Sequence, residues 1–379
     1  MPGCMEVDQS ELAGYSFSCL EGCAMCCLCQ PELSLAELER FRQRGLTGGL
    51  TKNHLQGYVT DEPTAIRLQG GSGACHFLRK RRCVAYDIRP AFCRQFPVHI
   101  HALHRIQLNA NLSCRGIVRG GDSLEAFGKA VLGDADPQSI AEATAEASSS
   151  LSAYREEAGD GYRTPDELRA YGQAVLPMLR SPGGIGKLLA LADSVPGEIP
   201  AKDVAAAVDT AMLPGDLEET ASAGNMQQLD LENPAWQPVY VDEKFRWLTY
   251  RAVGDSIEVQ ELAEDGSLAP AMEIPAEEVG LLRPDLRALG VFGEYSGLLN
   301  SRDTFLGYAY WLCREAGYEH DLATTYLGAM ATTMLDLWWR SCLVGRILRR
   351  EKLDGTLAME GVRAFDMDCL DMPTIGLFF

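Results

Sequence analysis

Residues 15–29 read YSFSCLEGCAMCCLC, and five of these positions are cysteine. The five are Cys19, Cys23, Cys26, Cys27 and Cys29. Three residues separate the first two, two residues separate the second from the third, the fourth is adjacent, and the fifth follows after one residue. Spacings this short let one loop turn and aim successive sulfurs at a shared centre. The stretch therefore predicts an irregular metal-binding loop.

A second cysteine-rich stretch, residues 75–97, reads CHFLRKRRCVAYDIRPAFCRQFP, and Cys114 follows it. Ten of the 13 cysteines precede residue 115. The opening MPGCMEVDQS has no basic residue, and no apolar segment of signal-peptide length follows it, so we expect a cytoplasmic protein. Thiols stay reduced there, and clustered cysteines then indicate metal ligands rather than disulfides.

Both stretches together resemble the YkgJ-like cysteine-cluster family of zinc- or iron-chelating proteins, over about residues 15–115. The family signature joins a CxxCxxCC-type loop to a Cys-x-Phe-Leu element and a Cys-x-x-Tyr-x-x-Arg-Pro-x-x-Cys-Arg-x-Phe-Pro element. The matching residues are Cys19, Cys23, Cys26, Cys27, Cys75, Phe77, Leu78, Cys83, Tyr86, Arg89, Pro90, Cys93, Arg94, Phe96 and Pro97. The wider first spacing and the additional Cys29 depart from the signature and leave the number of ligands open.

Eight cysteines form the predicted ligand set, which is the number that two four-cysteine centres require. They are Cys19, Cys23, Cys26, Cys27, Cys75, Cys83, Cys93 and Cys114. Adjacent cysteines point in different directions, so the first loop can supply both centres. Ligands scattered over several loops favour iron-sulfur clusters, of the 4Fe-4S type, because zinc sites commonly use two short Cys-pair knuckles. Zinc remains the alternative.

Several neighbouring residues suit a cluster environment, and each also has a purely structural interpretation. Arg89 and Arg94 are candidate cofactor-binding residues that offset thiolate charge, or they are solvated surface arginines. Glycines within residues 70–73 bring backbone N–H groups to sulfurs or form a flexible loop. The basic run 79–82 docks an acidic redox partner or an anionic substrate, or is simply solvated. Histidines within residues 99–104 ligate metal or belong to an ordinary hairpin.

The composition excludes a disordered or fibrous chain, because 46% of the 379 residues are hydrophobic and 23% are charged. The net charge is −19, unevenly distributed: residues 1–120 hold 14 Lys and Arg against 10 Asp and Glu, and the rest hold 20 against 43. An acidic body repels phosphate backbones and anionic lipids, so we expect no nucleic-acid partner. We also expect no membrane span.

The remaining patterns predict an α+β protein: an irregular cysteine-rich metal domain with a hairpin, a small antiparallel sheet and a mostly helical remainder. Ser34 is expected to cap a helix with Leu35, Leu38 and Phe41 on one face, and a hairpin is expected to turn near residues 102–104. The predicted units are a metal domain (1–121), a helical segment (122–233), a three-stranded antiparallel meander (234–282) and a helical C-terminal unit (283–379).

One long C-terminal helix is predicted between Asp321, its N-cap, and about Lys352, with Gly355 terminating it. Asp336 and Arg340 lie four residues apart in its apolar stretch, which favours a salt-bridged helix over a transmembrane one.

Function is best predicted as an iron-sulfur protein in electron transfer or metalloenzyme assembly, with a protein partner or protein substrate. The Cys19, Cys23 and Cys26 spacing also looks like a radical S-adenosylmethionine signature, and flagellin lysine methylases are similar in pairing a related cysteine domain with a helical region. An S-adenosylmethionine-using modification enzyme is therefore one alternative, and a zinc-stapled interaction module is another. No Walker loop, GxGxxG or GxSxG motif is present, which disfavours nucleotide hydrolysis, Rossmann cofactors and serine esterase chemistry.

Overall fold

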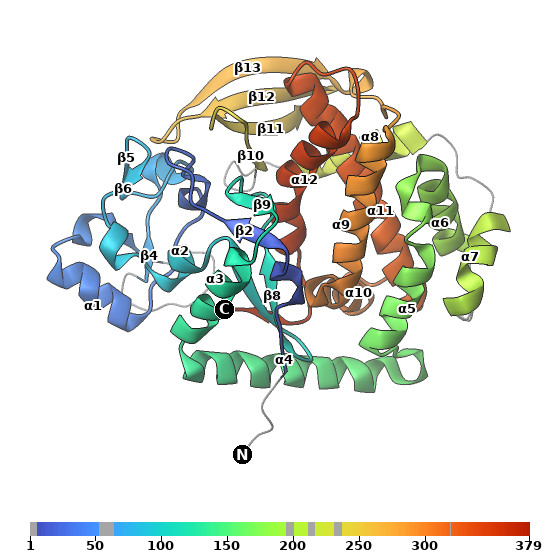
Figure 1. Ribbon diagram of the computed structural model, residues 1–379, viewed down its shortest axis with the longest axis horizontal. Coiled ribbons are helices and arrows are strands. Elements are labelled where there is room, and N and C mark those ends of the chain that lie inside the picture. Colours follow the sequence, from blue (N-terminus) through green and yellow to red (C-terminus); the bar gives the residue numbers. More distant parts are fainter. Residues whose placement is uncertain (1–5, 53–63, 195–200, 211–216, 231–236, 319) are drawn as a thin grey trace.

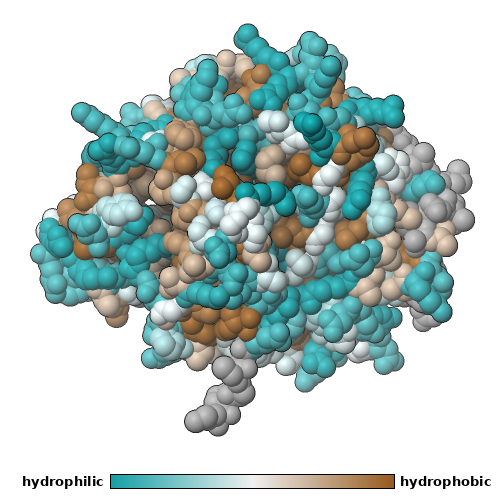
Figure 2. Space-filling model, viewed as in Figure 1, coloured by the Kyte–Doolittle hydropathy of each residue, from teal (hydrophilic) through white to brown (hydrophobic). Residues whose placement is uncertain are grey.

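The computed structural model describes the chain except for residues 1–5, 53–63, 195–200, 211–216, 231–236 and 319. The cysteine-rich N-terminal part lies on one side of the molecule and the helices lie on the other (Figure 1). A small sheet covers one end of both, and a long helix, α4, runs along the opposite end. Hydrophilic side chains cover most of the face shown in Figure 2, with separate hydrophobic patches between them.

Short elements joined by irregular loops make up the N-terminal part. They are β1 (Val7–Asp8), η1 (Ser10–Leu12), β2 (Tyr15–Phe17), η2 (Met25–Cys27), α1 (Leu35–Gln43), η3 (Thr47–Gly49), β3 (Leu50–Thr51), β4 (Ala65–Ile66), η4 (Gln69–Gly71), β5 (Leu78–Arg79), β6 (Arg82–Cys83), η5 (Tyr86–Ile88), α2 (Ala91–Gln95), β7 (Val98–Ala102), β8 (Ile106–Ala110) and β9 (Ile117–Arg119). The η elements are single 3-10 turns. This part is therefore shaped by its loops rather than by long regular elements.

Helix α1 begins with the predicted cap. The Ser34 hydroxyl accepts a hydrogen bond from the Glu37 N–H, and the Glu37 carboxylate accepts one from the Ser34 N–H, at 3.3 and 3.0 Å. Leu38 and Phe41 are buried, whereas Leu35 is 71% exposed. The predicted apolar face was thus wrong at Leu35, because the first turn of the helix projects into solvent.

The predicted hairpin is present and is the centre of a four-stranded sheet, ordered β1-β8-β7-β14. Strands β7 and β8 pair antiparallel, and β1 pairs with β8 in parallel. Strand β14 (Leu377–Phe378), at the end of the described chain, pairs antiparallel with β7. The last strand therefore fastens the helical part to the cysteine-rich part.

Helices dominate the rest of the chain. They are α3 (Ser123–Asp134), α4 (Pro137–Ala158), η6 (Gly159–Gly161), α5 (Pro165–Val175), η7 (Met178–Arg180), α6 (Pro182–Ser194), α7 (Ala201–Thr210), α8 (Leu217–Leu229), η9 (Ala276–Glu278), α9 (Leu286–Ser301), α10 (Asp303–Arg314), α11 (Leu322–Ile347) and α12 (Gly355–Leu370). Helix α11 packs against α5, α6, α8, α9, α10 and α12, so it forms the middle of the helical body.

Helix α11 begins at its predicted cap, where the Asp321 carboxylate accepts hydrogen bonds from two backbone N–H groups. Two predictions about it were wrong. Gly355 does not terminate the helix but begins α12, because Asp354 caps that next helix through the Leu357 N–H. The ion pair of Arg340 is made with Asp368 on α12. Across the described residues, no helix combines the length and the apolar character that a membrane crossing requires.

The small sheet is an antiparallel meander of four strands, one more than predicted. Its strands are β10 (Val239–Val241), β11 (Trp247–Val253), β12 (Ser256–Leu262) and β13 (Leu268–Pro275). The sequence of β13, LAPAMEIP, contains two prolines, which normally mark a chain segment as non-strand. Pairing is possible because β13 is an edge strand and its register shifts opposite Val259 and Gln260.

A buried charge network joins the cysteine-rich part to the helical body. Arg302, between α9 and α10, contacts the Glu11 carboxylate at 2.8 Å and the Asp366 carboxylate at 2.6 Å. All three side chains are at most 2% exposed. Glu11 also accepts hydrogen bonds from Asn109 and from the Ala110 N–H. Because such charges are costly to bury unpaired, this junction has one defined arrangement.

Candidate metal centre

One cavity of about 470 Å³ brings all eight predicted ligands together. The cysteines that line it are Cys19, Cys23, Cys26, Cys27, Cys75, Cys83, Cys93 and Cys114. They come from the first loop, the β5–β6 hairpin region, α2 and the loop after β8, up to 95 residues apart in sequence. Cys29 does not line the cavity; it is half-buried outside it, and desolvation raises its pKa to about 12.

The first loop turns through two residues in left-handed backbone conformation, Gly22 (φ 85°) and Ala24 (φ 51°). The single turn η2 follows and ends at Cys27, whose N–H donates to the Ala24 carbonyl. The Cys27 carbonyl in turn accepts a hydrogen bond from the Cys75 N–H at 2.7 Å. The two cysteine-rich stretches are thus connected through their backbones at the wall of the cavity.

Backbone N–H groups donate to four of the cysteine sulfurs, each from the residue two positions later. The pairs are Met25 to Cys23, Phe77 to Cys75, Ala85 to Cys83 and Gly116 to Cys114. Each bond lowers the pKa of its thiol, because an N–H group stabilises a thiolate more than a thiol. Hydrogen bonds to sulfur also tune iron-sulfur and zinc centres. This donor pattern suits bound thiolates.

Burial has the opposite effect on most of these thiols. It raises the pKa of Cys75 to about 11 and that of Cys114 to about 12, and it raises that of Cys93 well above the usual value. The exception is Cys26, whose pKa is lowered to about 7, first by a hydrogen bond from the Cys27 thiol and then by the Arg89 charge. Thiols whose pKa is raised in this way need a bound cation to become thiolates.

The eight sulfurs fall into two sets according to which neighbouring thiolates raise their pKa. Cys26 raises the pKa of all seven other thiols. Apart from Cys26, Cys114 is affected by Cys19 and Cys23, whereas Cys27, Cys75 and Cys93 are affected by Cys75 or Cys83. We count Cys26 with Cys19, Cys23 and Cys114 as the first set, and Cys27, Cys75, Cys83 and Cys93 as the second. Adjacent Cys26 and Cys27 thus connect them.

Arg89 is the cation with the widest influence on the cavity. Its charge lowers the pKa of the thiols of four cysteines, namely Cys19, Cys26, Cys83 and Cys93. The guanidinium lies over the Tyr86 ring, 3.7 Å from its centre, and donates to the Tyr86 carbonyl. Arg94 also lines the cavity and donates to the Arg89 carbonyl at 3.1 Å. Both predicted arginines therefore lie at the site.

Sequence reasoning missed the contribution of the meander. The Trp247 indole N–H donates to the Cys23 carbonyl at 2.9 Å, and Arg81 donates to the same carbonyl at 3.3 Å. The Arg81 guanidinium stacks on the Trp247 ring, 3.4 Å from its centre. Glu264, in the β12–β13 turn, accepts hydrogen bonds from the Lys80 and Arg81 N–H groups. These contacts join residues that are 58 to 224 positions apart in the sequence, so no local sequence pattern predicts them.

The structure favours the structural interpretation of the glycine loop and of the histidines, and it places the basic run in a turn. A Cβ at Gly70 or Gly73 would meet the β12–β13 turn at 2.3 Å, so these glycines permit close packing rather than contact with sulfur. The basic run forms the β5–β6 turn and is held by Glu264. None of the described histidines lines the cysteine cavity. Burial lowers the pKa of His99 to about 4 and that of His101 to about 3, so both are neutral.

The thiols surround the cavity rather than converging on one point. Within the described ranges, no three His, Cys, Asp or Glu side chains are placed to hold one metal ion between them. Eight soft thiol donors, four of them already accepting N–H groups, nevertheless match the ligand chemistry of zinc and of iron-sulfur centres and no hard-cation site. The residues present therefore fit a thiolate-bound metal group.

The cysteine lining of this cavity is that of a metal-binding site. Residues 18–115 match the model of the CxxCxxCC family, described as "Putative zinc- or iron-chelating domain". The match confirms the resemblance inferred from the cysteine spacing, over this part of the chain. No curated protein and no solved structure matches the chain.

Proposed function

We propose that the protein is an iron-sulfur protein that holds two cysteine-ligated clusters, of the 4Fe-4S type, and acts in electron transfer or in the assembly of another metalloenzyme. One observation carries the proposal: eight thiols line one cavity, which is the number that two four-cysteine clusters require. Four thiolates are the ligand number of one cluster. When bound, the clusters would supply one-electron chemistry.

The volume of the cavity supports iron-sulfur clusters over single zinc ions. A structural zinc ion needs four sulfurs at about 2.3 Å from one point. A cavity of about 470 Å³ with thiols around its wall suits a larger inorganic group that spans the space. The distribution of ligands over four separate segments fits the same interpretation.

The position of Cys114 supports a carrier over a radical enzyme. A radical S-adenosylmethionine centre uses three thiolates from one loop and leaves one iron open. Here Cys114 lies near enough to Cys19 and Cys23 for their charges to raise its pKa, so a fourth thiolate is at hand. Cys19 is also exposed, which gives the first set an edge accessible to a protein partner. Lysine methylation has no comparable support in the geometry.

Metal and sulfide analysis after strictly anaerobic purification tests the proposal. We expect about eight iron and eight sulfide per chain, with broad visible absorption that dithionite bleaches reversibly and S-adenosylmethionine leaves unchanged. A colourless protein with stoichiometric zinc and no sulfide would overturn it in favour of a zinc-stapled module. A cluster EPR spectrum that changes with S-adenosylmethionine would favour the enzyme.

Single substitutions test the two sets separately. Cys114→Ser should remove the iron of the first set, and Cys93→Ser that of the second, so each variant should retain about half the iron. Cys29→Ser is the matched control, because Cys29 lies in the same loop but outside the cavity. Unchanged iron in both of the first two variants would contradict the ligand assignment.

A further inference from the structure

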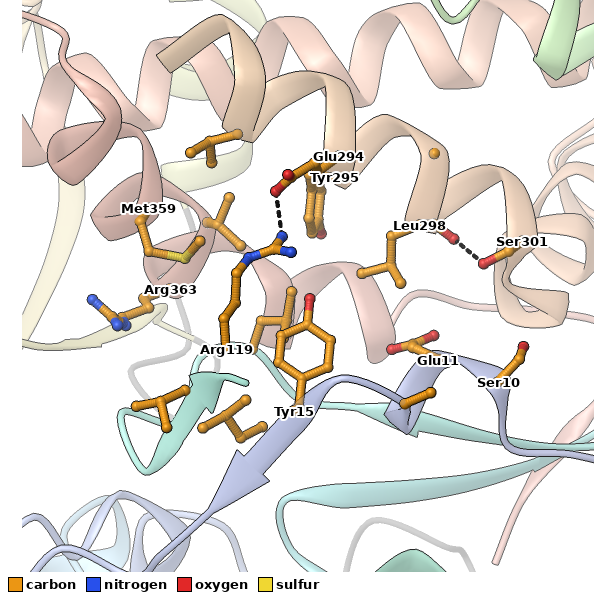
Figure 3. A pocket seen from close by; sticks show the side chains of 17 residues that line it. Ser10, Glu11, Tyr15, Arg119, Glu294, Tyr295, Leu298, Ser301, Met359 and Arg363 are labelled. Carbon is orange, nitrogen blue, oxygen red and sulfur yellow. Dashed lines mark hydrogen bonds and ion pairs between the residues drawn. The ribbon is translucent and has the colours of Figure 1, made fainter. Parts of the chain in front are cut away.

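A second cleft, of about 620 Å³, lies between the cysteine-rich part and the helical body. The β2–β9 ribbon and η1 form one side of it, and α9 and α12 form the other (Figure 3). Leu112 and Ile117 line this cleft, while Cys114, between them in sequence, lines the cysteine cavity. The two cavities are thus neighbours through one short segment, and the second contains none of the predicted metal ligands.

The walls of the cleft are mostly apolar. The apolar lining residues are Ala13, Leu112, Ile117, Val118, Val291, Leu298, Met359 and Val362. Tyr15 and Tyr295 add two aromatic rings. A volume of about 620 Å³, apolar walls and a position between two parts of a chain are the usual features of a small-molecule site.

The polar groups at the floor are already satisfied. Glu11 is held by Arg302, by Asn109 and by the Ala110 N–H, and the Tyr295 hydroxyl donates to Asp366. An incoming ligand would therefore find little to bind at the floor except apolar surface.

The rim, in contrast, has hydrogen-bond donors to spare. Arg119 crosses the opening to an ion pair with Glu294, and its guanidinium lies 5.6 Å from the centre of the Tyr15 ring (Figure 3). Both partners are more than half exposed, so the pair is weak and readily exchanged. The Tyr15 hydroxyl points into the cleft (Figure 3). Arg363 also lines the cleft, but its guanidinium is turned away from Arg119 (Figure 3) and pairs with Glu360.

We propose that this cleft binds a small organic anion with an apolar body, such as a medium-chain carboxylate. Its acid group takes the place of Glu294 at Arg119 and accepts from the Tyr15 hydroxyl, while its apolar body lies along Leu298 and Val362. The groups that an incoming ligand meets at the rim, Arg119 and the Tyr15 hydroxyl, are hydrogen-bond donors, so the rim favours an anion although the chain as a whole carries −19.

Calorimetric titration of the full chain with decanoate tests the proposal, with decyltrimethylammonium as the probe of opposite charge. We expect one decanoate per chain and clearly weaker binding of the cation. Arg119→Gln should weaken decanoate binding about tenfold, since it removes a charge-assisted hydrogen bond. Leu298→Trp should abolish binding by filling the cleft, and Val118→Trp, at a 55% exposed strand position, serves if that variant does not fold.

Arg155→Gln is the matched control, because Arg155 also lies by a tyrosine ring, 5.1 Å from the centre of Tyr162, but outside the cleft. It should bind decanoate as the wild type does. Absent decanoate binding, equal binding of both probes, wild-type affinity in Arg119→Gln, or binding that survives the cleft-filling substitution would overturn the proposal. Metal content measured on the same samples keeps this result separate from the proposed iron-sulfur function.

Discussion

Replacement of Trp247, in β11, by Phe should loosen the predicted metal-binding loop of residues 15–29, which we call the metal loop. Trp247 is fully buried, donates its indole N–H to the Cys23 carbonyl at 2.9 Å and carries the Arg81 guanidinium on its ring. Phe keeps an aromatic ring in place but cannot donate. The Cys23 carbonyl is then left with only the longer bond from Arg81, 3.3 Å.

The cost can be worked from these contacts. The lost hydrogen bond is worth about 1 kcal/mol, the weakened cation–π contact about 0.5 kcal/mol, and the smaller ring leaves a void that costs about 1 kcal/mol. We expect the free energy of unfolding to fall by about 2–3 kcal/mol in urea titrations followed by circular dichroism. If about half of this loss of free energy falls on the metal loop, the rate of metal release to a chelator rises about tenfold.

Trp338→Phe is the control for this experiment. Trp338 is equally buried and also donates to a backbone carbonyl, that of Leu282 at 3.0 Å, but it lies in α11 and does not line the cavity of the eight cysteines. It should lose comparable stability while releasing metal at the wild-type rate. Equal release rates in the two variants would refute the idea that the meander positions the metal loop.

Three further substitutions have defined outcomes. Arg302→Gln should destabilise the fold by about 3–5 kcal/mol in urea titrations, because two buried carboxylates lose their partner; a loss below 1 kcal/mol would argue against the network. Burial raises the pKa of Asp336 from 3.8 to about 6, so its ionisation lowers the stability of the fold as pH rises between these values. Asp336→Asn should therefore have a free energy of unfolding about 2–3 kcal/mol above that of the wild type at pH 8, and the same value at pH 3.5. A pH-independent difference would contradict this. Arg89→Gln should raise the pKa of Cys26 and slow its alkylation by iodoacetamide at pH 7 in metal-free protein; an unchanged rate, measured by mass spectrometry, would exclude the charge effect.

Features determined by residues close together in the sequence were predictable. The cap at Ser34, the cap at Asp321 and the β7–β8 hairpin follow from side chains within a few residues of each other. The gathering of the eight cysteines was also predictable, because their number and spacing have no ordinary structural explanation in a reduced protein.

Features that depend on distant partners were not predictable. Trp247 and Glu264 reach the metal loop and the basic turn across about 180 to 220 residues, and nothing near either residue signals this. Strand β13 forms in spite of its two prolines because the neighbouring strand β12 pairs with it. Arg340 pairs with Asp368 rather than with Asp336 on its own helix because α12 packs against α11. Tertiary contacts outweighed local preference in each case.

Anomalous diffraction at the iron edge, on crystals of anaerobically purified protein, tests the central claim most directly. We predict two iron peaks inside the cavity lined by the eight cysteines, one beside Cys114 and the other beside Cys93. A cavity without an iron peak, a peak only at the zinc edge, or cysteines joined to one another by disulfides would contradict it.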